Sequence, residues 1–478
     1  MRTAGRAAVA AAVVGPASLL DGAERSFAAT APDHVQHFVT RPDLRPPLLT
    51  ISHHGPIASG DLFIAPSSGP GQRGTMIADA AGALVWFHPT VPQTAMNFRA
   101  ATYRKKPVLT WWEGKTDQGL GTGTHVIVDD AYQLIATLPA GKGRQSDLHE
   151  FVITPDDTAL MTSYEVRTMD LTPVGGPPSG LVIGGVVQEV ALPSGRVLFE
   201  WRSLDHVPIE ETHARWEGHP VDYFHVNSIG ITADGNLLVS ARNTWAVYKI
   251  NRKTGNVQWR LGGRKSDFHM GPGTVFAWQH DAREHGENRF TIFDDGAMPQ
   301  VEPQSRALLI ELAPGRRTAR LVRKWVHRPN RIVSRFMGNM QQLDNGNVLV
   351  GWGSEPYVTE FGPDGDIRFE ARLPEGGQNY RAFRFPWHGQ PALPPKVAYR
   401  YSYRQHQGTV YVSWNGATEV AAWQLESGPS EASMSADQTV PKHGFETALP
   451  VTPGHRYGRA VALDAQGNVL RRSKTIRV

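Results

Sequence analysis

One short phrase recurs six times along the 478-residue chain and restricts its possible folds more than any other feature. Each copy is a turn containing Gly or Asp, followed by a strand-like run of aromatic and aliphatic residues. The copies begin at positions 80, 129, 193, 253, 314 and 363, so they are 49, 64, 60, 61 and 49 residues apart. A four-stranded unit repeated at this spacing is typical of a β-propeller blade with its loops.

We therefore predict an all-β protein with a six-bladed propeller over residues 45–390. A set of β-sandwiches is the alternative, but sandwiches do not require one strand phrase six times, whereas a closed ring of blades leaves no long strand edge open. The repeat ends at about Pro394, and the strand-like stretches that follow predict a small fibronectin-III-like β-sandwich over residues 394–478. The 48 glycines, the 35 prolines and the lack of long helical periodicity agree with this fold class.

The first residues have the layout of a secretory signal peptide. Arg2 and Arg6 precede an apolar run from Ala7 to Leu20, and small residues follow at positions 28–31. The sequence therefore predicts a signal peptide over residues 1–31 and a secreted protein, with an alanine-rich disordered leader as the alternative. The apolar run is short for a bilayer span, so no membrane span is predicted.

The overall composition excludes several functions. The charge balance is only +4 and forms no basic stripe, so nucleic-acid binding has no support. The chain has no cysteine, which excludes a disulfide framework and a thiolate zinc site.

Polar residues interrupt the strands that we expect to line the propeller channel. In the stretch FHVNSI, His225 and Asn227 are two residues apart, so their side chains leave an extended strand on one side. Aligning the blades on their second strands brings polar residues of four other inner strands to nearly the same level: Arg99, His149, His280 and Asn339. A slip of one residue would reverse the face. Together with Arg242, at the end of the following strand, these residues predict a site at the mouth of the channel.

The residue types at this level favour a tetrahedral anion over a metal ion. Imidazole, amide and guanidinium groups donate hydrogen bonds to oxyanions. The neighbouring carboxylates, those of Asp147, Glu150 and Asp281, are expected to point to the other face, so we predict neither a metal nor a cofactor. Two other functions stay open: a metal-dependent hydrolase or lyase with a three-histidine site, and a non-catalytic exported propeller that binds partners.

Four stretches resemble the arylsulfate sulfotransferase (arylsulfotransferase) family, and its shorter, actinobacterial-type branch in particular. They are LHEFVITPDD, DYFHVNSIGITADGNLLVSARN, VYKINRKTGNVQWRLGG and FAWQHDA, and the resemblance covers roughly residues 45–390. It implies a six-bladed propeller. It also implies sulfuryl transfer from a phenolic sulfate ester to a phenol, without phosphoadenylyl sulfate and through a sulfohistidine. The longer periplasmic members carry an N-terminal sandwich and a disulfide, whereas here the predicted sandwich is C-terminal and cysteine is absent.

The resemblance also implies roles for individual residues. His280 would be the nucleophile, and His225 and Arg242 would complete the catalytic set. His149 and Asn227 would bind the sulfuryl group, and the alignment of the blades adds Arg99 and Asn339 to the substrate-binding residues. Ser354 is a candidate hydroxyl ligand from the last blade. The partners would be small molecules, an aryl sulfate donor and a phenol acceptor, whereas the natural substrates and the oligomeric state stay open.

Overall fold

The computed structural model describes residues 34–286 and 288–478. Within these ranges the regular structure consists of 37 β-strands and five short 3-10 turns, with no α-helix. The all-β prediction is therefore confirmed. No helix among the described residues is long and apolar enough to cross a membrane. The predicted signal peptide lies outside the described residues.

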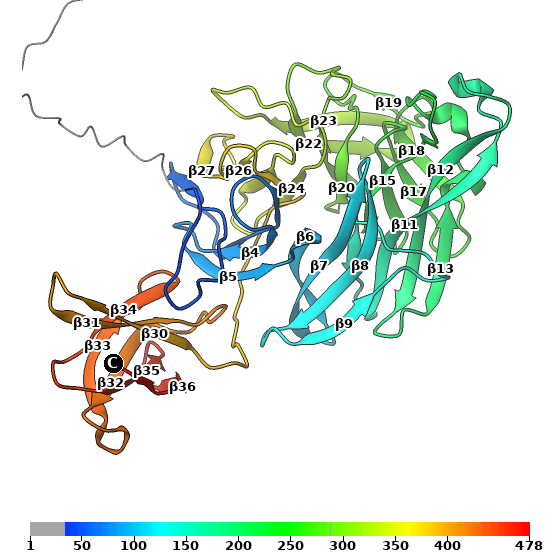
Figure 1. The fold of residues 1–478 in the computed structure, drawn as a ribbon. Helices are drawn as coiled ribbons and strands as arrows, with labels where there is room; N and C mark the ends of the chain where they lie inside the picture. Colours follow the sequence, from blue (N-terminus) through cyan, green and yellow to red (C-terminus); the bar gives the residue numbers. More distant parts are fainter. Residues whose placement is uncertain (1–33, 287) are drawn as a thin grey trace, which may run out of the picture. The chain divides into compact units, whose positions relative to one another are not determined.

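The strands before Pro394 form six main antiparallel sheets within the described ranges, each built around four strands (Figure 1). The first three are β29-β2-β4-β5 (Phe383–Phe385, Asp61–Ile64, Gly74–Ala78, Leu84–Pro89), β6-β7-β8-β9 (Thr94–Tyr103, Lys106–Asp117, Leu120–Asp129, Leu134–Leu138) and β10-β11-β12-β13 (Phe151–Ile153, Thr158–Met169, Gly180–Ala191, Val197–Arg202). The other three are β15-β16-β17-β18 (Val226–Ile231, Leu237–Ala241, Ala246–Ile250, Val257–Gly262), β20-β21-β22-β23 (His280–Glu284, Arg289–Asp294, Arg306–Ala313, Thr318–Trp325) and β24-β25-β26-β27 (Asn339–Gln342, Val348–Gly351, Tyr357–Phe361, Ile367–Arg372).

Shorter strands extend some of these sheets at their edges. They are β1 (Thr50–His53) beside β27, β14 (Val221–Asp222) beside β12, and β19 (His269–Met270) beside β23. A separate pair joins β3 (Pro66–Ser68) to β28 (Gln378–Asn379).

The phrase that recurs in the sequence supplies the fourth strand of each set as given above, namely β5, β9, β13, β18, β23 and β27. In each sheet the pairing of this strand with its neighbour contains a register shift. The turn before the strand is left-handed, and glycine, which adopts positive φ without steric cost, occupies it in four copies: Gly82, Gly195, Gly255 and Gly365. The repeat therefore encodes a left-handed turn followed by a β-bulge.

Neighbouring sheets pack face to face, and the hydrophobic core lies between them. One cluster joins Ile127 of β8 to Met161 of β11, and another joins Val247 of β17 to Ile292 of β21. Along the first strands the contacts run from β29 to β6, β10, β15, β20 and β24, and β25 contacts β29 in turn. Because β29 also pairs with β2, residues near both ends of this region share one sheet.

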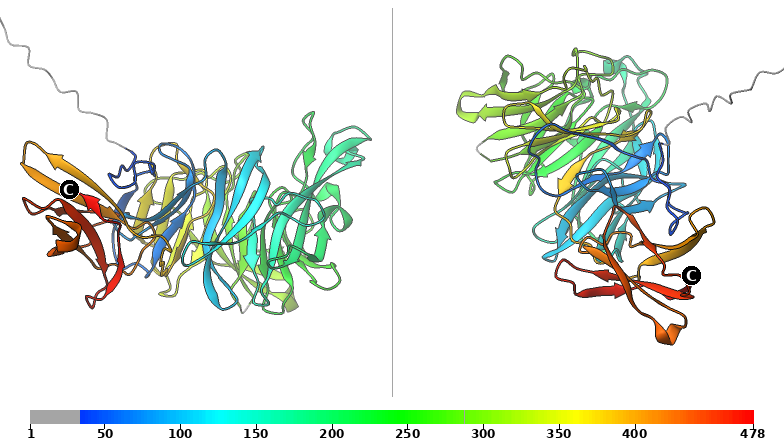
Figure 2. Two further views of the ribbon diagram at one scale, coloured as in Figure 1. Left: turned by 60° about the horizontal axis from the view of Figure 1, so that its bottom comes forward. Right: turned by 90° about the vertical axis from the view of Figure 1, so that its left-hand side faces the viewer.

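The residues after Pro394 form two further sheets with a core between them (Figure 2). The first sheet is β30-β31-β34 (Lys396–Ser402, Gln407–Ser413, Glu446–Pro450). The second is β33-β32-β35-β36 (Ser435–Pro441, Ala422–Gly428, Tyr457–Leu463, Val469–Arg472), with β37 (Ile476–Arg477) beside β35. Val412 and Leu449 of the first sheet belong to the same buried cluster as Trp423 and Ala460 of the second.

Candidate functional site

A cavity of about 920 Å³ lies at the amino-terminal ends of the inner strands of several sheets. Three predicted histidines line it, His149, His225 and His280, and Arg242 lines it from the end of β16. The ring centroids of His149 and His225 are 4.8 Å apart, and those of His149 and His280 are 6.5 Å apart. The structure therefore brings together the histidines and the arginine that the sequence singled out.

Each of these histidines is held by an aspartate through its Nδ1 atom. The pairs are His149–Asp147 (2.6 Å), His225–Asp222 and His280–Asp295 (2.8 Å). A neutral ring whose Nδ1 hydrogen is donated to a carboxylate keeps the lone pair on Nε2. Burial favours the neutral rings of His149 and His280. In these two rings Nε2 is therefore free to act as a nucleophile or acceptor.

The sequence did not predict these pairs. Strand alternation would turn the carboxylate of Asp147 away from His149, yet Asp147 accepts hydrogen bonds from both the ring and the backbone of His149. Asp222 and Asp147 lie within three residues of their histidines, so the spacing was an available signal. Asp295 is fifteen residues after His280, at the end of the neighbouring strand β21, and only the β20–β21 pairing brings it near.

His280 is the most deeply buried of the three histidines, with 1 % of its surface exposed, compared with 3 % for His149 and 8 % for His225. Burial lowers the pKa of His280 well below its usual value of 6.5, and the positive charge of Arg242 lowers it further. Burial also lowers the pKa of His149. His280 is therefore a neutral imidazole at neutral pH, which is the nucleophilic form.

Arg242 supplies a positive charge at the cavity. Its guanidinium donates to the Asn243 side-chain oxygen at 3.1 Å and to the Arg335 carbonyl at 3.4 Å, and it lies 4.8 Å from the Trp278 ring centre. Because both acceptors are neutral, its charge is not cancelled by direct contact with them. Asp295 and Asp222 act on Arg242 through their charge without a hydrogen bond to it, so its N–H groups could also bind a tetrahedral anion.

Three other predicted residues do not line this cavity. Asn227 is fully buried and donates to the Gln279 carbonyl at 2.6 Å, and the Asn339 side chain makes two hydrogen bonds to the backbone of Ala382. Arg99 lines a different cavity.

The prediction that all these residues reach the channel at one level needs correction. The inner strands contain bulges near their first residues, which strand alternation does not take into account. Asn97, His225 and Asp281 have positive φ, and the β6, β15 and β20 pairings shift register beside them. A bulge of this kind re-aims the side chains around it.

Ser354 also lies outside the residues that line the cavity. Its hydroxyl oxygen accepts a hydrogen bond from the Arg335 backbone at 2.9 Å. Ser354 therefore contacts Arg335, whose carbonyl accepts a hydrogen bond from Arg242, and it does not contact the histidines.

The sequence did not predict that Tyr380 and Arg381 hold the backbone beside the histidines. The Tyr380 hydroxyl donates to the carbonyls of His149 and Asn227, both at 3.2 Å, and Arg381 donates to the Asn227 carbonyl at 2.8 Å. Arg381 also pairs with Glu150 at 3.0 Å, and both side chains are fully buried. The aromatic and basic segment YRAFRFPW was the available signal, since polar residues in such a segment need partners when buried.

Aromatic and thioether groups complete the wall of the cavity. Trp245, Trp278, Phe336 and Met298 line it beside the histidines. Within the described part of the chain, no three or more His, Asp or Glu side chains form a group that could hold a metal ion. The arrangement can bind an anion at the Arg242 guanidinium and an aromatic group against the wall.

Comparison with known proteins gives one family match. Residues 99–373 match a family model described as arylsulfotransferase (ASST), which spans more than half of the chain. None of the curated proteins matches the chain significantly.

Among the solved structures, three similar ones cover most of both chains. A Bacteroides caccae protein of unknown function has 14 % identity and a TM-score of 0.43, over 68 % of this chain and 98 % of that one. A catalytically inactive virginiamycin B lyase from Staphylococcus aureus, with quinupristin, has 8 % identity and a TM-score of 0.36, over 77 % and 97 %. Apo AztD from Citrobacter koseri has 12 % identity and a TM-score of 0.30, over 70 % and 100 %.

Proposed function

Because the chain belongs to the arylsulfotransferase (ASST) family, we propose that it moves a sulfuryl group from a phenolic sulfate ester to a phenol through a sulfohistidine on His280. One observation carries the mechanism: the buried His280 ring is bound through Nδ1 to Asp295 at the cavity. A ring held in this way presents the Nε2 lone pair to the donor. The double displacement would give ping-pong kinetics.

The atoms and protons of this reaction balance. The Nε2 lone pair of His280 attacks sulfur, and the bond between sulfur and the aryl oxygen breaks, so a phenolate leaves. The Nδ1 proton passes to Asp295, whose pKa is raised by burial. The acceptor phenol then attacks the same sulfur, the N–S bond breaks, and the proton returns to Nδ1.

The remaining polar groups would stabilise the charge that moves during each transfer. Sulfuryl transfer, like phosphoryl transfer, is expected to spread negative charge over the equatorial oxygens, so fixed cationic donors matter most. Arg242 would donate to those oxygens, and the neutral ring of His149 would line their binding position. The protonated form of His225 would give its Nε2 proton to the departing phenolate, and its neutral form would later take the proton of the acceptor phenol. The aryl rings would lie against Trp278 and Phe336.

We also propose that the chain folds as a six-bladed propeller followed by a β-sandwich. The cyclic order of contacts from β29 through β24 and back supports six sheets that act as blades of one propeller over residues 45–390. The two packed sheets after Pro394 support a fibronectin-III-like sandwich over residues 394–478. Secretion through a signal peptide over residues 1–31 stays a prediction, which N-terminal sequencing of the exported protein tests.

We expect Arg242→Ala to slow turnover without unfolding the protein. Loss of a charge-assisted donor to a developing negative charge costs roughly 2.7–4 kcal/mol, or about 10²–10³ in rate. Arg242→Lys keeps the charge but loses the planar fork, so its rate should fall between those of wild type and the alanine variant. Turnover of an aryl sulfate and thermal melting measure these effects, and wild-type turnover by Arg242→Ala would place the sulfuryl group elsewhere.

The rate of the first step should stay flat as the pH falls from about 8 to about 6. An ordinary histidine, with a pKa of 6.5, would lose roughly fourfold of its neutral form over this range. Because burial and Arg242 lower the pKa of His280, its ring stays neutral throughout. Stopped-flow measurement of the nitrophenol burst from 4-nitrophenyl sulfate tests this, and a fall with a midpoint near 6.5 would contradict it.

A further inference from the structure

A second cavity, of about 570 Å³, lies at the carboxyl ends of the inner strands, whereas the histidine cavity lies at their amino-terminal ends. Strand β6 illustrates this, since Met96 lines the histidine cavity and Thr102 lines the second one. Likewise His280 at the start of β20 faces the first cavity, and Arg283 further along faces the second. The mechanism proposed above uses no residue of this second cavity.

A layer of buried charge lies between the two cavities along these strands. Glu150 follows His149 and precedes Val152, and it pairs with Arg381 at 3.0 Å and also with Arg283. Arg283 pairs in turn with Asp281 at 2.6 Å. Glu150 and Arg381 are fully buried, so the second cavity is a site of its own rather than an extension of the first.

The arginine and lysine side chains that line the second cavity outnumber its carboxylates. One terminal nitrogen of Arg99 donates to Glu150 and to the Phe151 carbonyl, while its Nε and Nη1 make no hydrogen bond within the described structure. Lys105 makes no ion pair to any described residue. Of the two carboxylates that line the cavity, Asp281 is paired with Arg283, whereas Asp157 accepts a hydrogen bond from a neutral backbone N–H. An anionic ligand would match the spare donors.

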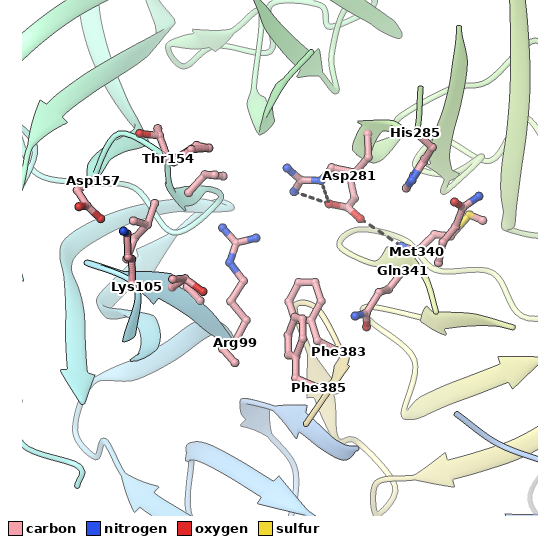
Figure 3. Close-up of a pocket in the computed structure, with 18 residues that line it drawn as sticks. Arg99, Lys105, Thr154, Asp157, Asp281, His285, Met340, Gln341, Phe383 and Phe385 are labelled. Carbon is pink, nitrogen blue, oxygen red and sulfur yellow. Dashed lines mark hydrogen bonds and ion pairs between the residues drawn. The ribbon is translucent and has the colours of Figure 1, made fainter. Parts of the chain in front are cut away.

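The part of the cavity wall that β29 supplies is aromatic. The rings of Phe383 and Phe385 are stacked, with centroids 5.7 Å apart and an angle of 26° between their planes. The Arg99 guanidinium lies 5.9 Å from the Phe383 ring centre, and Figure 3 shows it reaching into the cavity beside these rings. Val152 and Met340 add apolar surface nearby. A flat apolar group would therefore fit against this wall.

We propose that the second cavity binds a small aromatic anion. Its ring would lie on Phe383 and Phe385, and its acid group would lie between Arg99 and Lys105. This proposal does not depend on sulfuryl transfer at the other cavity.

Isothermal titration calorimetry with benzenesulfonate tests this proposal, since a sulfonate is not an ester and cannot transfer its sulfur. The titrations use the Arg242→Ala protein, so that the histidine cavity contributes little. Lys105→Glu should weaken binding about tenfold, because it reverses a charge that faces the ligand. The matched control is Lys106→Glu, on the next exposed residue outside the cavity, which should weaken binding less than about threefold.

Two further titrations test the two parts of the ligand. Arg99→Gln should abolish binding while its melting temperature shows that the fold persists, since Glu150 keeps Arg283 and Arg381 as partners. Methanesulfonate, which has no ring, should bind at least about tenfold more weakly than benzenesulfonate. Equal effects of Lys105→Glu and Lys106→Glu, or no binding of benzenesulfonate at millimolar concentration, would overturn the proposal.

Discussion

Replacement of His280 by asparagine should abolish both the covalent adduct and the turnover of aryl sulfates. Asparagine keeps a hydrogen-bonding side chain but has no nucleophilic ring nitrogen. Wild-type protein given 4-nitrophenyl sulfate alone should release a single burst of nitrophenol and gain one SO₃ group by intact-mass spectrometry. A phenol added afterwards should remove that mass and restore turnover. The variant should show neither burst nor adduct while melting normally.

A matched control for this experiment is His213→Asn. His213 lines the same cavity but stacks on Trp245, with ring centroids 3.6 Å apart, and its Nε2 has no hydrogen-bond partner in the described structure. This variant should keep the adduct and most of the turnover. An adduct on His149 or His225 would show that the nucleophile is misassigned although the mechanism stands. Absence of any adduct, with activity lost on dialysis against a chelator, would favour a metal-dependent hydrolase or lyase instead.

The fold class could be predicted from the sequence because the repeat encodes a local structure. The left-handed turn and the bulge after it need particular residues, above all glycine at positions such as Gly82 and Gly255, so the phrase is visible six times. Two copies place Tyr132 and Arg317 in the left-handed turn instead, which weakens the signal without removing it. The packing of β29 into the first sheet had no such local signature, since it joins Phe383 to Phe63 across the whole region.

The site could be predicted only in part. His149, His225 and His280 meet as expected, because each lies at the beginning of an inner strand. Arg99 does not join them, because the bulge in β6 and the strand beyond it carry its side chain toward the other cavity. Strand alternation assumes regular backbone. The alternation rule therefore fails at residues with positive φ, such as Asn97, His225 and Asp281. These residues set the direction of the side chains at the site.

The pairing of His280 with Asp295 leads to the second large effect. Asp295→Asn should lower the rate of adduct formation by about 10³–10⁴, as in triads where an amide replaces the aspartate that orients a histidine. The amide nitrogen would donate to Nδ1, so the ring proton would move to Nε2, and the lone pair that attacks sulfur would be lost. The burst rate with 4-nitrophenyl sulfate measures this effect, and the melting temperature reports on the fold.

The two other pairs provide the internal control. Asp147→Asn and Asp222→Asn make the same change beside His149 and His225, neither of which attacks sulfur in the proposed mechanism. A proton on Nε2 of either ring leaves the attacking lone pair of His280 in place, so these variants should lose no more than about 10² in the burst rate. The three matched substitutions therefore identify the nucleophile without removing any histidine. If Asp147→Asn or Asp222→Asn proves the slowest of the three, the nucleophile is its own histidine partner and not His280.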